Sequence, residues 1–253
     1  MKRMLTYTQG VALFHGLQTD LDHDYGIHMN QNQMENIVNV MTNKFPSGGN
    51  RDTYAECVFL EKDKANEQDY RTAKSFAKML ENAEFRDILK ELVEFGISRY
   101  ERDFSNTYRN TNFVLYQKYT YEDVYRLLNW ERNEVPLNIG GYKFDKKTKT
   151  FPVFINYDKA EDISDTTKYE DHFAGNHTLI AISKSGRSVN SEDVQNFLHA
   201  QERGIQVHLF VRKNKDDSIS KEFYYLGNMR ASGKCREFIM PKTDKKAVEI
   251  EWL

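Results

Sequence analysis

The stretch VFINYDKAEDISDTTKYEDHF, from Val153 to Phe173, concentrates side chains that can do chemistry. An apolar strand leads into a loop with six carboxylates, two tyrosines and three hydroxyl residues. The same residue types can hold a metal ion, form a pocket for a nucleic-acid base, or make ordinary turn hydrogen bonds. The loop by itself leaves these three interpretations open, so the rest of the chain has to decide between them.

Complete catalytic signatures are absent from the sequence. It has no glycine-lysine phosphate loop, no GxGxxG after a strand, no HExxH pair and no nucleophile elbow. The cluster of His23, Asp24 and His28 lacks the i, i+4 spacing of helical zinc ligands, and the residues around His172 have the composition of a loop. We therefore predict that this chain is not itself an enzyme and holds neither a metal nor a cofactor.

The composition is typical of a globular protein that does not enter a membrane. The chain has 253 residues, of which 39% are hydrophobic, and a formal net charge of -2. Its longest apolar run is far shorter than the ~18 residues of a membrane span, and its start lacks the apolar segment of a secretory signal. Cys57 and Cys235 are too few for a disulfide framework. We expect a cytoplasmic protein, whose binding to DNA would depend on local clusters of cations.

The spacing of the apolar residues differs between the two halves of the chain. Apolar residues recur at spacings of three and four over residues 33–44 and 69–101, which indicates helices, the second being one helix or a broken pair. We expect their apolar stripes, including Ile88 and Leu92, to be core. Strand patterns dominate after the polar stretch SNTYRNTN. The sequence thus predicts a helical coupler region at residues 1–112 and a strand-rich domain at residues 113–253.

Local signals place the elements of the second domain. Thr120 and Asp123 form a capping box for a short helix, GGYKF and FPVFINY form a hairpin with the basic tip DKKTK, and Asn190 caps a second helix. IQVHLFVRK alternates apolar and polar residues, which is typical of a half-buried strand. The expected fold class is α+β: an N-terminal helical region followed by a curled, barrel-like β domain with flanking helices.

Several segments of the second half resemble one protein family. They are the run from YTYEDVYRLLNWERN through residue 173, SKSGRS, and VHLFVRK followed by FYYLG. They resemble the C-terminal domain of SauUSI-like type IV, modification-dependent restriction endonucleases, most closely over about residues 115–230. In that family a phospholipase-D-like nuclease and a superfamily 2 helicase motor precede this domain, and residues 1–110 resemble the coupler between motor and reader.

The resemblance implies an SRA-like domain, related to PUA barrels, that reads 5-methylcytosine or 5-hydroxymethylcytosine in double-stranded DNA. The helicase and nuclease domains of the same polypeptide would be its partners, and ATP and Mg²⁺ would serve those parts, which this chain lacks. A homodimer is a further expectation.

A reader that flips the modified cytosine out of the duplex needs aromatic faces, a carboxylate for the exocyclic amine and a small apolar recess for the methyl group. Among the carboxylates Asp162 is favoured, because it closely follows Tyr157 and Ile163 can shield it from water. This chain has Ala181 and Ile182 where the family often has an aromatic residue, so stacking has to come from the tyrosines. The base-binding candidates are Tyr142, Tyr157, Asp162, Tyr169 and Asp171.

Two cationic loops, the hairpin tip and SKSGR, are expected to contact DNA phosphates without reading sequence. The backbone-binding candidates are Lys146, Lys147, Lys149, Ser183, Lys184, Ser185 and Arg187. Two rival interpretations stay open. The chain could be a coupling or dimerisation module that binds protein, which exposed apolar helix faces would favour, or a hydrolase whose acidic loop holds a divalent metal.

Overall fold

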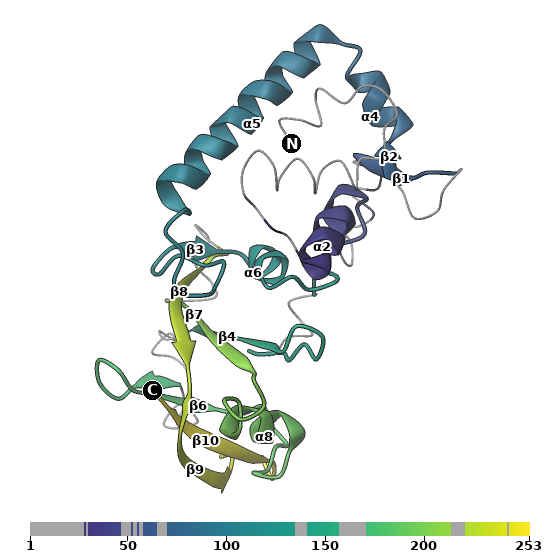
Figure 1. Cartoon of the computed structure of the whole chain (residues 1–253). Coiled ribbons are helices and arrows are strands. Elements are labelled where there is room, and N and C mark those ends of the chain that lie inside the picture. The colour runs from purple at the N-terminus through teal and green to yellow at the C-terminus, as the bar shows by residue number, and fades with distance from the viewer. Residues whose placement is uncertain are drawn as a thin grey trace. The chain divides into compact units, whose positions relative to one another are not determined.

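The computed structural model describes residues 30–46, 58–64, 70–134, 141–156, 171–213, 221–241 and 243–253, together with residues 28, 52 and 55. Contacts divide the chain into two compact units: a helical unit, Met1–Asn106 with Asn129–Val135, and a β-rich unit, Thr107–Leu128 with Pro136–Leu253. Figure 1 labels the elements of both. The domain boundary between residues 112 and 113 stays a prediction.

The helical unit contains the helices predicted at residues 33–44 and 69–101. Its described elements are α2 (Gln31–Met41), β1 (Leu60–Lys62), β2 (Tyr70–Thr72), α4 (Lys74–Met79) and α5 (Ala83–Asp103). Asn30 and Gln33 form a capping box that starts α2. The second predicted helix is a broken pair, because the Asn82 side chain accepts a hydrogen bond from the Phe85 N–H and starts α5 anew. The antiparallel β1–β2 pair was not predicted, since strands this short carry no clear period.

Helix α5 exposes a line of large apolar side chains. Ile88, Leu92 and Phe95 are 59%, 63% and 61% exposed, and their spacing of four and three residues puts them on one face of the helix. The prediction that Ile88 and Leu92 are core residues is therefore wrong. Val93 is the buried residue of this helix, and Phe85 and Leu89 pack against a small core formed by Ala73, Phe76 and Leu80, so the helix turns a neighbouring apolar face inward.

The β-rich unit is built from two four-stranded sheets with the strand orders β5-β6-β10-β9 and β3-β8-β7-β4. Strands β4 and β7 run parallel and the other neighbours antiparallel. Its elements are β3 (Lys118–Tyr119), α6 (Tyr121–Leu127), β4 (Thr150–Asn156), β5 (His172–Phe173), β6 (Leu179–Ile182), α8 (Glu192–Leu198), β7 (Gln206–Arg212), β8 (Phe223–Met229), β9 (Ala231–Ile239) and β10 (Lys246–Trp252).

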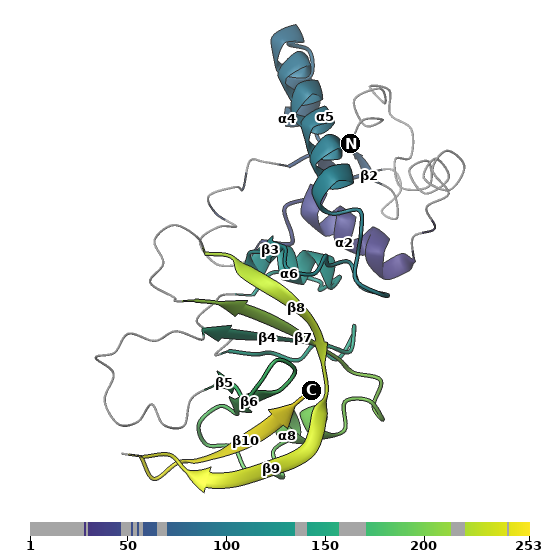
Figure 2. The same ribbon diagram turned by 90° about the vertical axis from the view of Figure 1, so that its left-hand side faces the viewer.

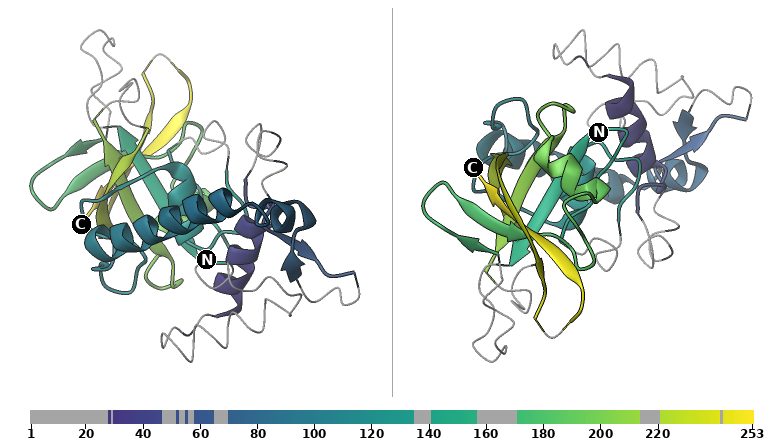
Figure 3. Two further views of the ribbon diagram at one scale, coloured as in Figure 1. Left: turned by 90° about the horizontal axis from the view of Figure 1, so that it is seen from above. Right: turned by 90° about the horizontal axis from the view of Figure 1, so that it is seen from below.

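One long curved ribbon joins the two sheets. Only Arg230 separates β8 from β9, and Figure 2 shows the two strands as a continuous arc. Gly227 has a φ of +106°, and the register shifts nearby between Leu209 and Phe210. Glycines and bulges of this kind bend strands at barrel corners. Seen from below in Figure 3, the β9–β10 hairpin crosses the strands of the other sheet. The predicted α+β class with a curled β domain is confirmed.

The main core lies between the two sheets and α8. Within it, the rings of Phe151 and Phe197 stack with centroids 4.0 Å apart. Strand β7 differs from the prediction of a half-buried strand, because Phe210 and His208 on its second face are also buried. Both pack against the ring of Phe113, with centroids 5.2 and 5.6 Å away. Packing of Phe113 on this second face therefore buries both faces of β7, although the sequence suggests that only one face is buried.

Two further local predictions can be compared with the structure. The capping box of Thr120 and Asp123 starts α6 as predicted. The predicted hairpin around DKKTK is present as isolated antiparallel bridges, one of which joins Tyr142 to Val153, beside the full strand β4. Among the described residues, none of the helices is both long and apolar enough to cross a bilayer.

Candidate functional site

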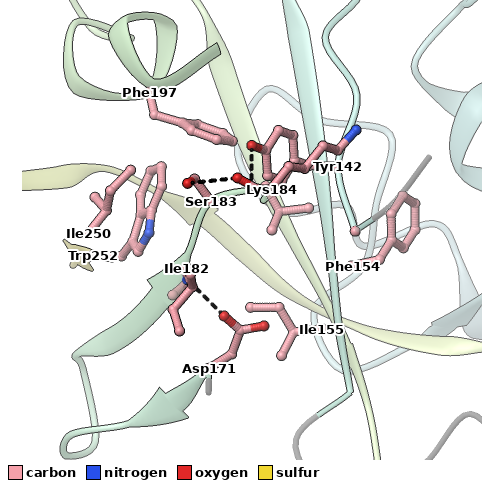
Figure 4. A pocket seen from close by; sticks show the side chains of 13 residues that line it. Tyr142, Phe154, Ile155, Asp171, Ile182, Ser183, Lys184, Phe197, Ile250 and Trp252 are labelled. Atoms are coloured by element: carbon pink, nitrogen blue, oxygen red, sulfur yellow. Dashed lines mark hydrogen bonds between the residues drawn. The ribbon is translucent and has the colours of Figure 1, made fainter. Parts of the chain in front are cut away.

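The β-rich unit contains a pocket of about 130 Å³, which we call the central cavity. Residues from the hairpin, β4, β6, α8 and β10 form its walls, as Figure 4 shows. Its lining residues are Gly141, Tyr142, Val153, Phe154, Ile155, Asp171, Ala181, Ile182, Ser183, Lys184, Phe197, Ile250 and Trp252. The cavity thus gathers side chains from distant parts of the chain, most of them apolar and aromatic.

Aromatic rings hold each other in place along the cavity wall. The ring of Phe197 makes edge-to-face contacts with Tyr142 and Trp252, with centroids 4.9 and 5.0 Å away. Such pairs are worth roughly 0.5–1.5 kcal/mol beyond the area that they bury. These contacts restrain the three rings, and a ligand ring would meet aromatic surface.

Polar groups converge on the same cavity. The Asp171 carboxylate accepts a hydrogen bond from the Ile182 N–H at 2.8 Å, which fixes it beside the end of β6. A carboxylate offers about four lone-pair sites, so it can accept several hydrogen bonds at once. The buried Ser183 hydroxyl accepts from the Val248 N–H at 2.8 Å and contributes to the wall.

Tyr142 lines both the central cavity and a second hollow. Its hydroxyl donates to Asp193 Oδ2 at 2.8 Å and accepts from the Lys184 N–H at 3.0 Å. Burial raises the pKa of Tyr142, so its hydroxyl keeps the proton that it donates to Asp193. The Lys184 ammonium lies 4.7 Å from the centre of the Tyr142 ring, within the range of a cation–π contact.

The second hollow is a cleft of about 450 Å³, which we call the cationic cleft. Lys143, Lys146, Lys184 and Arg187 contribute to its lining, together with Tyr142 and the first residues of α8. Lys146 pairs with Glu192 at 3.1 Å, and Arg187 donates to Asp193 at 2.7 Å.

Burial and charge tune the ionisable groups that line the cleft. Burial would raise the pKa of Asp193, but hydrogen bonds from Arg187 and Tyr142 outweigh it and hold the pKa below its usual value. Burial lowers the pKa of Lys184. Asp193 therefore stays ionised and fixes Arg187 and Tyr142 in position.

Helix α8 does not begin as predicted. The helix starts after Ser191 and not after Asn190, and the Ser191 side chain makes no capping bond to the helix. The Ser191 hydroxyl instead accepts from the Ser188 N–H at 2.9 Å. The Asp193 carboxylate, three residues after the predicted cap Asn190, accepts hydrogen bonds from Tyr142 and Arg187.

The structure brings only some of the predicted site residues together. Tyr142, Asp171, Ser183 and Lys184 line the central cavity, while Lys146, Lys184 and Arg187 line the cationic cleft. Three predicted base-binding residues lie outside the described residues: Tyr157, Asp162 and Tyr169. Three predicted backbone contacts line neither hollow: Lys147, Lys149 and Ser185. The assignment of all these residues to base or backbone stays a prediction.

Sequence reasoning missed Asp193, Phe197 and Trp252 as site residues. A signal for Trp252 was present, because Val248, Ile250 and Trp252 alternate along β10 and all three are buried. The indole Nε1–H of Trp252 has no hydrogen-bond partner although the side chain is only 2% exposed. Leaving such a donor unpaired costs about 1–3 kcal/mol. Among the described residues there is no group of acidic, histidine or cysteine side chains placed to hold a metal ion.

Two family models match the sequence. One, described as Domain of unknown function (DUF3427), matches residues 113–253. The other, described as Domain of unknown function (DUF8090), matches residues 3–102. No curated protein matches the chain.

Solved structures show slight likenesses to the chain. The SRA domain of SUVH5 in complex with hemimethylated CG DNA is 11% identical, with 58% of this chain and 89% of that chain covered and a TM-score of 0.35. The DNA modification-dependent restriction endonuclease AspBHI is 11% identical, with 54% of this chain and 71% of that chain covered and a TM-score of 0.35. SUVH6 of Arabidopsis thaliana in complex with SAM is 9% identical, with 99% of this chain and 38% of that chain covered and a TM-score of 0.36. Likenesses of this size do not establish a function for this chain.

Proposed function

This chain belongs to the family described as Domain of unknown function (DUF3427), and we propose that its β-rich unit recognises modified cytosine in double-stranded DNA. The observation that carries the proposal is the central cavity, which combines aromatic walls with the Asp171 carboxylate. The ligand that we assign to it is 5-methylcytosine or 5-hydroxymethylcytosine, flipped out of the duplex.

The size of the central cavity favours a single ring. An apolar cavity of about 150 Å³ holds one benzene molecule. The central cavity, at about 130 Å³, therefore suits one six-membered ring, and a purine with two fused rings is too large for it. A base of a duplex can reach such a pocket only when its nucleotide leaves the stack.

The chemistry of the walls favours cytosine with a substituent at C5. Asp171 can accept from the exocyclic amine of cytosine, which thymine lacks. Ile155, Ala181 and Ile250 supply apolar surface for a methyl group. One methyl-sized group in a pocket is worth only about 1–3 kcal/mol, so we expect a modest preference for the modified base over cytosine.

The cationic cleft supplies contacts for the DNA backbone beside the base. Because Lys184 lines both hollows, a phosphate in the cleft and a base in the central cavity could belong to one flipped nucleotide. Asp193 and Glu192 hold Arg187 and Lys146 by ion pairs, which keeps the cations in place but reduces the positive charge of the cleft. Phosphate contacts of this kind position the duplex without reading its sequence.

The resemblance to type IV restriction endonucleases supports a wider proposal. In it, this chain is the target-reading part of a SauUSI-like, ATP-dependent enzyme that acts in the cytoplasm. The helicase and nuclease domains of the same polypeptide are its partners and use ATP and Mg²⁺. This chain itself performs no catalysis in the proposal.

A coupling or dimerisation module is the second candidate function. The exposed apolar face of α5, formed by Ile88, Leu92 and Phe95, favours it. Exposed apolar surface on a helix is a common feature of protein-binding sites. This role is compatible with a base reader in the other unit, since the two functions use different parts of the chain.

Base flipping can be tested with 2-aminopurine placed beside the modified cytosine in a duplex. Flipping of the cytosine unstacks its neighbour, so we expect 2-aminopurine fluorescence to rise when the chain binds the modified duplex, and to rise less with the unmodified one. Binding without any change in fluorescence would contradict enclosure of the base in the central cavity.

A further inference from the structure

Trp252 places an unsatisfied donor in the wall of the central cavity. Its side chain is 2% exposed, lines the cavity, and has no hydrogen-bond partner for its indole N–H. Buried polar groups in proteins are bonded in the great majority of cases. An unpaired donor on a residue that lines a cavity therefore suggests that a ligand acceptor completes it.

The fold holds this donor in a fixed position. Trp252 pairs with Leu179 across the β6–β10 ladder, and the next residue, Leu253, exchanges two backbone hydrogen bonds with Arg230 at 2.9 and 3.0 Å. The edge-to-face contact with Phe197 restrains the indole ring itself. In Figure 4 the indole stands in the wall of the same pocket as Asp171, with Ile182 between them.

We infer that the Trp252 indole N–H donates to the N3 or O2 acceptor of the bound base and acts with Asp171 as a specificity pair. The inference rests on the proposed function and deepens it. A methyl recess cannot by itself identify 5-methylcytosine, because thymine is also a 5-methylpyrimidine. Cytosine carries an amine donor beside a ring acceptor, whereas thymine carries the opposite pattern at these two positions. One acceptor and one donor in the wall fit the cytosine pattern.

The indole N–H can be observed directly in the whole chain by NMR. The sequence contains two tryptophans, Trp130 and Trp252, so two indole N–H signals are expected. Trp130 lies in the helical unit and serves as the internal control, and the variant Trp130→Phe assigns the signals. We expect binding of a 5-methylcytosine duplex to move the Trp252 proton downfield and slow its exchange with water, while the Trp130 signal stays in place.

Base analogues identify the acceptor. We compare duplexes in which N3 of 5-methylcytosine is replaced by C–H, or in which the O2 oxygen is replaced by hydrogen. One of these changes should weaken binding to the wild-type chain roughly 5- to 150-fold, the effect of one buried unpaired donor. The same change should have little effect on Trp252→Phe, which has no N–H to leave unpaired. If that variant does not fold, the NMR signals and the two analogues with the wild-type chain still test whether Trp252 donates to the base.

The outcomes separate this inference from the proposed function. Preferential binding of the modified duplex with an unchanged Trp252 signal, or with no loss for either analogue, would overturn the role of Trp252 and leave the base reader intact. Equal affinity for modified and unmodified duplexes would overturn both.

Discussion

Replacing Asp171 with asparagine should weaken the binding of duplexes with a flipped cytosine without unfolding the chain. The Oδ1 atom of Asp171 accepts from the Ile182 N–H at 2.8 Å, and the amide oxygen of asparagine can keep that bond. The other position then carries an NH₂ group, which opposes the cytosine amine. Hydrogen bonds to charged groups contribute about 1.5–3 kcal/mol, so we expect binding of a 5-methylcytosine duplex to weaken about 10- to 150-fold.

The assay is isothermal titration of the whole chain with modified and unmodified duplexes, accompanied by thermal unfolding. Asp244→Asn is the matched control, because it removes the same charge from an exposed position in the β9–β10 turn. We expect Asp171→Asn to lose this affinity for the modified duplex while Asp244→Asn binds it as tightly as the wild-type chain. Unchanged affinity of Asp171→Asn for the modified duplex would refute the role of Asp171 as the base acceptor.

Three further predictions concern the cationic cleft, a buried histidine and α5. Lys184→Ala should weaken the binding of modified and unmodified DNA alike, and should lower the slope of log affinity against log salt concentration by about 1. In a salt titration, a loss of affinity confined to the modified duplex would contradict this prediction. Burial lowers the pKa of His208 to about 4 from about 6.5, so the unfolded chain binds more protons between these values. Stability should therefore fall by up to about 3 kcal/mol as the pH drops from about 6.5 to 4. In urea unfolding, His208→Gln should reduce this loss and the half-exposed control His199→Gln should not. Leu92→Glu should change the free energy of unfolding by less than about 0.5 kcal/mol, as is usual for exposed positions, whereas Val93→Ala should lower it by more. Sedimentation of Leu92→Glu then tests whether the exposed apolar face of α5 mediates self-association.

The parts of the fold that depend on local rules were predictable from the sequence. The capping box at Thr120 and the helices α2 and α5 follow from side chains within a few residues of each helix start. Burial that depends on distant residues was not predictable. Strand β7 carries polar His208 where alternation suggests solvent, but Phe113, far away in the sequence, covers it.

The candidate site was predictable only in part, for the same reason. Asp171 and Tyr142 were named because their residue types suit a base. The rings of Phe197 and Trp252 reach the cavity from α8 and from the last strand, which no local pattern connects to the loop after β4. Asp193 lies three residues after the predicted cap Asn190, and its partners, Tyr142 and Arg187, come from two other segments.

The most direct test of the central claim is fluorescence anisotropy of one duplex in three forms, carrying cytosine, 5-methylcytosine or 5-hydroxymethylcytosine, titrated with the whole chain at two salt concentrations. Phosphate contacts weaken steeply with salt, whereas base contacts depend on it much less. We predict tighter binding of a modified form, with a ratio of affinities to the unmodified form that persists at the higher salt. Equal affinity for all three forms would contradict a base reader and leave coupling or dimerisation as the function.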